Sequence, residues 1–243
     1  MAPRTPLLRP DHYFNDREPA ITRGLVVAVL VTLTAVALIA GIGIVFTEKI
    51  DGTVMVDNPD RPPEGFCETG GTSLPDGFDD SAFNCSAPAE IERNIDSLID
   101  DALGGFYGVM LIGAPILLLV IAAAFHVATA AVGGEGSFGV TATVTAWGFA
   151  PTIVTTPLGL AALWVVMDPV TIAAGIEPAA LEQTLLGSLS PWLPLATGLN
   201  LSSLLWGAII WTFGLQAGRD VSRLQAGGIA AAVTGLLLLG AAP

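Results

Sequence analysis

The stretch GEGSFGV, from Gly134 to Val140, matches the pattern G-x-G-x-x-G. Dinucleotide-binding folds use this pattern, and the loop that covers ATP in protein kinases resembles it. A kinase also needs a catalytic lysine and the motifs H-R-D and D-F-G, and a P-loop needs Gly-Lys-Ser/Thr. The single lysine, Lys49, precedes the stretch, and none of these motifs occurs. We therefore expect no nucleotide site and interpret the glycines as a turn.

Long apolar blocks flank this turn on both sides. Hydrophobic residues make up 52% of the 243-residue chain and charged residues only 13%, and the mean hydropathy is +0.69. A helix needs about 20 apolar residues to cross the hydrocarbon core of a bilayer. The sequence thus predicts an all-α membrane protein, a bundle of five transmembrane helices. The predicted spans are 24–46, about 106–132, 140–167, 197–216 and 224–242.

Polar segments divide the chain further. Residues 1–23 form an N-terminal arm, in which Leu7, Leu8, Tyr13 and Phe14 are expected either on the membrane surface or, for the first residues, in a disordered tail. Residues 47–104 hold most of the 22 acidic residues and form an acidic loop domain inserted between spans one and two. Its end has helical periodicity, which predicts an amphipathic helix over 90–103. The rest of the chain, 105–243, holds the other four spans.

Charge predicts the topology and excludes one class of partner. The formal net charge is −13, and such a surface repels nucleic acid. The low lysine content is typical of a haloarchaeal source. Six basic residues lie near span ends on one side of the membrane, and the three on the other side all lie in the long acidic loop, where charge counts less, which places the N-terminus in the cytoplasm. Residues 47–104 and the C-terminus are then extracytoplasmic, in a multi-pass protein of the cell membrane. The six basic residues near span ends are Arg4, Arg9, Arg17, Arg23, Arg219 and Arg223.

The two cysteines, Cys67 and Cys85, both fall in the predicted extracytoplasmic segment. An oxidising exterior favours a disulfide between them. Two free thiols or half of a metal site are the alternatives, and the lack of a nearby histidine argues against zinc. Asn84 begins an N-x-S/T pattern on the same side, so it is a candidate for glycosylation.

The turn itself has a structural interpretation. Gly133 and Gly134 can adopt the left-handed conformation that ends a helix, and Ser137 can cap the next helix. His126 is the one strongly polar side chain inside span two. It is either functional or a neutral ring bonded to a hydroxyl of span three. Asn200, with Ser202 and Ser203, is expected to form hydrogen bonds between helices.

The run from His126 to Val154 resembles the Yip1 domain family of multispanning membrane proteins. The matching features are a helix that ends in Gly-Gly, a Gly-Ser-Phe turn and an aromatic-Gly-aromatic-Ala-Pro run. The arm's Arg9 to Phe14 and the region from Leu205 to Gln216 also look like parts of the family. The residues that carry the match are Gly133, Gly134, Gly136, Ser137, Phe138, Trp147, Gly148 and Pro151.

The resemblance implies a non-catalytic integral membrane protein without cofactor or bound metal. Eukaryotic members are associated with Rab GTPases and vesicle traffic, so the implied role is membrane organisation or partner binding. The expected partners are the lipid bilayer and other proteins or a second copy of the chain. One alternative is a small-solute or ion transporter that uses His126 and the third span, which Pro151 and Pro157 should kink. Another is a sensor that binds cations at Asp76, Asp79 and Asp80.

Overall fold

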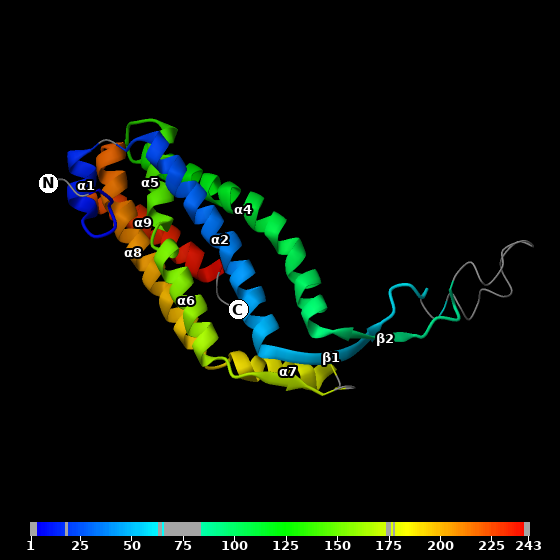
Figure 1. The fold of residues 1–243 in the computed structure, drawn as a ribbon. Helices are drawn as coiled ribbons and strands as arrows, with labels where there is room; N and C mark the ends of the chain where they lie inside the picture. The colour runs from blue at the N-terminus through cyan, green and yellow to red at the C-terminus, as the bar shows by residue number, and fades with distance from the viewer. Residues whose placement is uncertain are drawn as a thin grey trace, which may run out of the picture.

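The computed structural model describes residues 4–17, 19–62, 65, 84–173, 176 and 178–240. Within them, five helical segments are long and apolar enough to cross a membrane, which confirms the predicted fold class. The third segment consists of two successive helices (Figure 1). The segments are α2 (Ile21–Lys49), α4 (Ile95–Ala131), α5 (Phe138–Phe149) with α6 (Thr152–Val166), α8 (Leu193–Arg219) and α9 (Arg223–Gly240).

The bundle has two different ends (Figure 1). One end carries the short helix α1 (Pro10–Asp16), the turn at 132–137 and the loop at 220–222, and we call it the turn end. The other carries β1 (Ile50–Asp57), β2 (Glu90–Asn94), β3 (Val170–Ile172) and the helix α7 (Pro178–Leu189), and we call it the sheet end. The strands form one three-stranded sheet in the order β2-β1-β3.

The third span bends at Pro151, as the sequence predicts. Proline has no N–H to donate, so the regular helix stops at Phe149 and resumes at Thr152. The N–H of Ala150 donates to the Trp147 carbonyl at 3.1 Å. The hydroxyl of Thr152 donates to the Phe149 carbonyl at 2.6 Å. The bend therefore leaves these carbonyls satisfied, as a hydrocarbon environment demands.

The sheet corrects one prediction from the sequence. Residues 90–94, predicted as the start of an amphipathic helix, form the strand β2, and the helix begins only at Ile95. The register pairs Thr53 with Asn94 and Asp57 with Glu90, antiparallel to β1. Ile91 fits both a helical and an alternating pattern, so periodicity alone did not distinguish them. Pairing with β1, which is distant in sequence, gives these residues hydrogen bonds that a local pattern cannot reveal.

Helix α5 lies at the centre of the bundle. It contacts α2, α4 and α8, and its residues from Thr143 to Gly148 are all buried. Most of the other large apolar side chains point outward, as for Ile112 on α4, which is 65% exposed. An apolar outside around a tightly packed inside is the pattern of a protein that lies in a lipid bilayer.

Some residues of the predicted outer domain lie outside the described part of the chain. These are Cys67 and the acidic group Asp76, Asp79 and Asp80. Cys85 takes part in a disulfide, and its pairing with Cys67 stays a prediction. Asn84 lies in a turn with a positive φ of 53°, and its side-chain amide donates to the Asp60 carbonyl at 3.3 Å. Its glycosylation also stays a prediction.

The join between β1 and β3 depends on Gly52, whose φ is +138°. A Cβ there would lie 2.5 Å from the Ile172 carbonyl oxygen. We expect Gly52→Ala to lower the free energy of unfolding by about 1–3 kcal/mol, because the backbone would be strained and the strands pushed apart. Gly105→Ala is the control, since nothing lies within 4 Å of that position. Thermal unfolding in detergent measures both, and equal midpoints would contradict this role for Gly52.

Candidate functional site

The turn that joins α4 to α5 is built from glycines with different tasks. Gly133 and Gly136 have positive φ values of 87° and 107°. The hydroxyl of Ser137 accepts the N–H of Val140 at 3.4 Å and caps α5, as predicted. Gly134 differs from the prediction, because its φ is not positive. It is instead a point of close packing, where a Cβ would lie 2.8 Å from the Thr129 carbonyl oxygen and 3.0 Å from that of Arg219.

The side chain of Arg219 holds this turn from the end of α8. It is 2% exposed, and its Nε donates to the hydroxyl of Thr129 at 3.0 Å. Its Nη1 donates to the carbonyl of Gly136 and its Nη2 to that of Gly134 at 3.4 Å. The backbone completes the contact, because the N–H of Glu135 donates to the Arg219 carbonyl at 2.8 Å. One side chain thus connects α4, the turn and α8.

The positive charge of Arg219 is balanced by dipoles. Among the described residues the ion pairs join His12 with Asp11 and Arg93 with Asp101, so none includes Arg219. The guanidinium lies instead against turn carbonyls beside the C-terminus of α4, where the helix dipole is negative. Hydrogen bonds from a charged donor to carbonyl oxygens are stronger than neutral ones. This geometry explains how the protein tolerates a buried cation at this position.

The loop at 220–222 is ordered from both sides. Asp220 ends α8 with a positive φ of 51°. Ser222 and Gln225 then form a reciprocal cap, in which each side chain accepts the other's N–H, at 2.9 Å and 3.3 Å. The Gln225 amide also donates to the Val132 carbonyl at 3.5 Å. The two short connections at the turn end therefore support each other.

His126 connects α4 with α5 just below the turn. Its Nδ1 lies 3.2 Å from the hydroxyl of Thr141, so the partner is a hydroxyl of span three, as one of the two interpretations predicts. Its ring meets the ring of Phe138 edge to face at 5.6 Å. These contacts give the imidazole a packing role between two helices.

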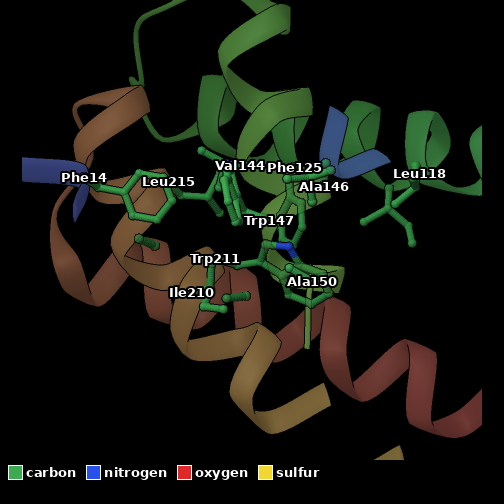
Figure 2. Close-up of a cluster of buried hydrophobic side chains, with 14 of the residues drawn as sticks. Phe14, Leu118, Phe125, Val144, Ala146, Trp147, Ala150, Ile210, Trp211 and Leu215 are labelled. Carbon is green, nitrogen blue, oxygen red and sulfur yellow. The ribbon is translucent and has the colours of Figure 1, made fainter. Parts of the chain in front are cut away.

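The run from Trp147 to Pro151 forms the closest helix contact in the bundle. The indole of Trp211 on α8 lies against Gly148, and its Nε1 donates to the Thr145 carbonyl at 3.1 Å. Figure 2 shows Trp211 within the cluster of buried side chains, near Trp147 and Ala150. A Cβ on Gly148 would overlap this indole, and a Cβ on Gly207 would overlap the Gly148 carbonyl. The rings of Phe125 and Phe149 pack against Trp211 at 5.1 Å and 5.2 Å. Only glycine at 148 and 207 allows α5 and α8 to approach this closely.

Leu7, Tyr13 and Phe14 of the N-terminal arm pack on the bundle, which corrects the prediction that they lie on the membrane surface or in a disordered tail. Leu8, by contrast, is 88% exposed. Tyr13 and Phe14 on α1 are only 2% and 4% exposed. Tyr13 meets the ring of Trp147 at 5.6 Å, and Phe14 lies against α8 near Leu215 (Figure 2). The Nε1 of Trp206 donates to the Leu7 carbonyl at 2.7 Å. The aromatic residues of the arm therefore pack on protein and not on lipid headgroups.

The model of the Yip1 domain matches residues 5–242. The chain belongs to the Yip1 domain family. No curated protein and no solved structure matches it. The matched range includes the whole of α1 and reaches α9, so the arm counts as part of the Yip1 domain, in agreement with its packing on α8.

In the part of this Yip1 domain that the structure describes, two polar residues of α8, Asn200 and Ser202, do not form the predicted hydrogen bonds between helices. The hydroxyl of Ser202 bonds within its own helix, to the Gly198 carbonyl at 2.7 Å. Asn200 is exposed, and its side-chain amide has no hydrogen-bond partner among the described residues, so the expected bond between helices is absent there. Among all the residues that the structure describes, no three His, Cys, Asp or Glu side chains are grouped to hold a metal ion.

Sequence reasoning missed the hydrogen bonds by which the Arg219 side chain holds the α4–α5 turn. The residue was counted only as a positive charge near a span end, although its position as the last residue of an apolar helix was a usable signal. A basic residue in the last turn of a helix can bond to nearby carbonyls. The particular carbonyls, in a turn far away in sequence, become visible only in the folded bundle.

We expect Arg219→Met to lower the free energy of unfolding by about 3 kcal/mol, because the turn loses three charge-assisted hydrogen bonds. Arg219→Lys should lose less, since an ammonium keeps the charge but not the planar arrangement of donors. Arg223→Met is the matched control, because Arg223 stacks on Phe213 at 4.4 Å and does not contact the turn. Thermal unfolding and protease cleavage at 132–137 measure these effects. Equal losses of stability in Arg219→Met and Arg223→Met would contradict the role of Arg219 in holding the turn.

We expect Gly148→Ala to destabilise the bundle by about 1–3 kcal/mol, because its methyl group would overlap the indole of Trp211. The double variant Gly148→Ala/Trp211→Leu should lose less than the sum of the single changes, since the smaller side chain leaves room for the methyl group. Gly159→Ala on α6 is the control, because its nearest neighbour, Leu199, would lie at an ordinary 3.7 Å. Thermal unfolding of all variants provides the comparison, and strictly additive losses would count against the contact.

Proposed function

We propose that this Yip1 domain is a non-catalytic membrane protein that binds protein partners through its turn end. The observation that carries the proposal is that three segments distant in sequence, the arm, the α4–α5 turn and the α8–α9 loop, are held together in one surface. Arg219 fixes the turn, Trp206 fixes the arm, and the cap at Ser222 fixes the loop between α8 and α9. A surface held in one shape loses little conformational freedom on binding, which favours recognition.

The exposed residues of this surface have the character of a binding face. Leu8 and Leu224 are each 88% exposed, and Glu135 is exposed at the tip of the turn. Leu8 in the arm and Leu224 in the first turn of α9 are available to a partner, and the carboxylate of Glu135 can select a basic group on it. A second copy of the chain and a different protein are both candidates for this partner.

In this proposal the turn end faces the cytoplasm and the sheet end faces outward, in the cell membrane. Two observations support the orientation. The arm and the α8–α9 loop contain Arg9, Arg17, Arg23 and Arg223 close to the span ends, and such residues remain on the cytoplasmic side. The disulfide at Cys85 belongs to the sheet end, and disulfides persist in oxidising surroundings.

Transport, the alternative considered from the sequence, has no specific observation in its favour. His126 is engaged by Thr141 and Phe138. The bend at Pro151 is packed against α8 through Gly148. Transporters commonly use discontinuous helices whose free ends face a substrate, whereas the carbonyls of Trp147 and Phe149 at this bend accept hydrogen bonds from the protein.

A single cysteine variant tests both the orientation and the binding. Glu135→Cys should react with a membrane-impermeant maleimide only from the cytoplasmic side. With a maleimide that carries a photoreactive benzophenone, it should form a discrete crosslinked product in the native membrane. Adding Arg219→Met should abolish this product, because the surface is no longer held in shape. Cys85 does not compete for the reagent, since it is disulfide-bonded.

Met55→Cys is the matched control, because Met55 lies on β1 at the sheet end and is 48% exposed. It should react only from the outer side and give a different pattern of products. The unmodified chain supplies the background. Labelling of position 135 from outside would overturn the orientation. The same products from both positions, or none from position 135, would overturn binding at the turn end.

A further inference from the structure

Two adjoining hollows lie among the membrane-spanning helices, the larger between α2, α4 and α6 with Asn200 of α8 at its edge, and the smaller between α2, α6 and α8. Their volumes are about 400 Å³ and about 220 Å³. Leu38, Thr152, Thr156 and Asn200 line both of them, so the two hollows lie side by side and share one wall. Asn200 is the eighth residue of α8, which places it about 10 Å along that helix. The combined space is of the size that holds small ligands.

One wall of this space is polar and has no charge. Thr152 and Thr155 donate their hydroxyl hydrogens to the carbonyls of Phe149 and Pro151, at 2.6 Å and 3.3 Å. Each hydroxyl oxygen then keeps lone pairs that can accept a hydrogen bond. Asn200 adds an amide with both donors and an acceptor, and no described residue uses them. The wall can therefore both accept and donate.

The wall formed by α2 and α4 is apolar except for Thr34, whose hydroxyl donates to the Leu30 carbonyl of its own helix at 2.8 Å. Helix α4 borders only the larger hollow. The apolar side chains of this wall include Val31, Leu117 and Leu118. Among the described residues, no Asp, Glu, Lys, Arg or His lines either hollow. A charged ligand would have no counter-charge there, at a depth where an unpaired charge is costly.

An unpartnered amide at this depth also needs an explanation. A polar group that faces hydrocarbon without a hydrogen bond costs free energy, because no water is present to replace the missing partner. Asn200 is exposed on the surface of the bundle, so its natural surroundings are lipid. A partner from the bilayer that brings its own hydrogen-bonding group would remove this cost.

We propose that the space around Asn200 binds an uncharged lipid that carries a free hydroxyl group. The hydroxyl donates to a threonine oxygen and accepts from the Asn200 amide, and a hydrocarbon chain lies along the wall formed by α2 and α4. A charged headgroup is disfavoured by the lack of any counter-charge. The proposal does not depend on partner binding at the turn end, which lies on a different part of the molecule.

A photoactivatable dialkylglycerol with a free hydroxyl is the probe. The full chain is placed in phosphatidylglycerol nanodiscs with the probe as a minor component, and labelled peptides are mapped by mass spectrometry. Labelling should concentrate on α8 around Asn200 and on the facing part of α4. The same probe with its hydroxyl converted to a methyl ether should label about fivefold less, the loss expected for one missing hydrogen bond.

Asn200→Leu and Thr156→Val should each reduce labelling by a similar factor. Asn200→Leu should fold normally, because it removes an unpartnered polar group from an apolar environment. Thr156→Val keeps the side-chain shape and serves as a second, independent variant. Ser202→Ala is the control on the same helix, because Ser202 lines neither hollow and bonds to Gly198. It should leave labelling unchanged.

Three results would overturn the proposal. One is equal labelling by the hydroxyl probe and its methyl ether. Another is labelling that Asn200→Leu and Thr156→Val leave unchanged. The third is a disulfide-linked dimer that forms through Asn200→Cys while the lipid probe fails to label, which would assign the amide to contact with a second copy.

Discussion

The turn end of the bundle depends on the hydrogen bonds of one buried guanidinium. Arg219 reaches from the last turn of α8 to the hydroxyl of Thr129 and to two carbonyls of the α4–α5 turn. Lipid chains are as apolar as leucine side chains, so burying apolar side chains between helices in a bilayer releases little free energy. Polar contacts of this kind therefore matter more for helix association. The positive end of the side chain lies where α4 presents its negative dipole. The position of three transmembrane helices follows from this one contact.

Small residues set the distances that this contact requires. Gly148 and Gly207 bring α5 and α8 together, and Gly134 lets the turn lie directly on Thr129 and Arg219. Because Gly148 has no side chain, there is also room for the buried indole of Trp211 at the centre of the bundle. Packing without voids is a main source of stability between helices in a membrane. The motif that suggested the family thus consists of contact points between helices, and no ligand is needed to explain it.

The sequence predicted those features that depend on composition over long windows. Hydropathy located five spans, and Pro151 predicted the bend in the third. The features that it missed are short and need distant partners. Helix α1 has only seven residues, too few for a reliable periodic pattern, and the segment just before it is held by Trp206, far along the chain, through the Leu7 carbonyl. The strand β2 likewise needs β1 before its alternation has meaning.

The sheet end shows how a long loop can leave a membrane bundle undisturbed. Strand β1 continues directly from α2, and β2 leads directly into α4. Beyond the last paired residues, Asn58 closes the gap, with its N–H donated to the Ala89 carbonyl at 2.9 Å and its side-chain amide to that of Pro88 at 3.0 Å. The chain thus leaves and re-enters the bundle at one point. Because the strands hold this point closed, α2 and α4 can pack against each other whatever the length of the segment between β1 and β2.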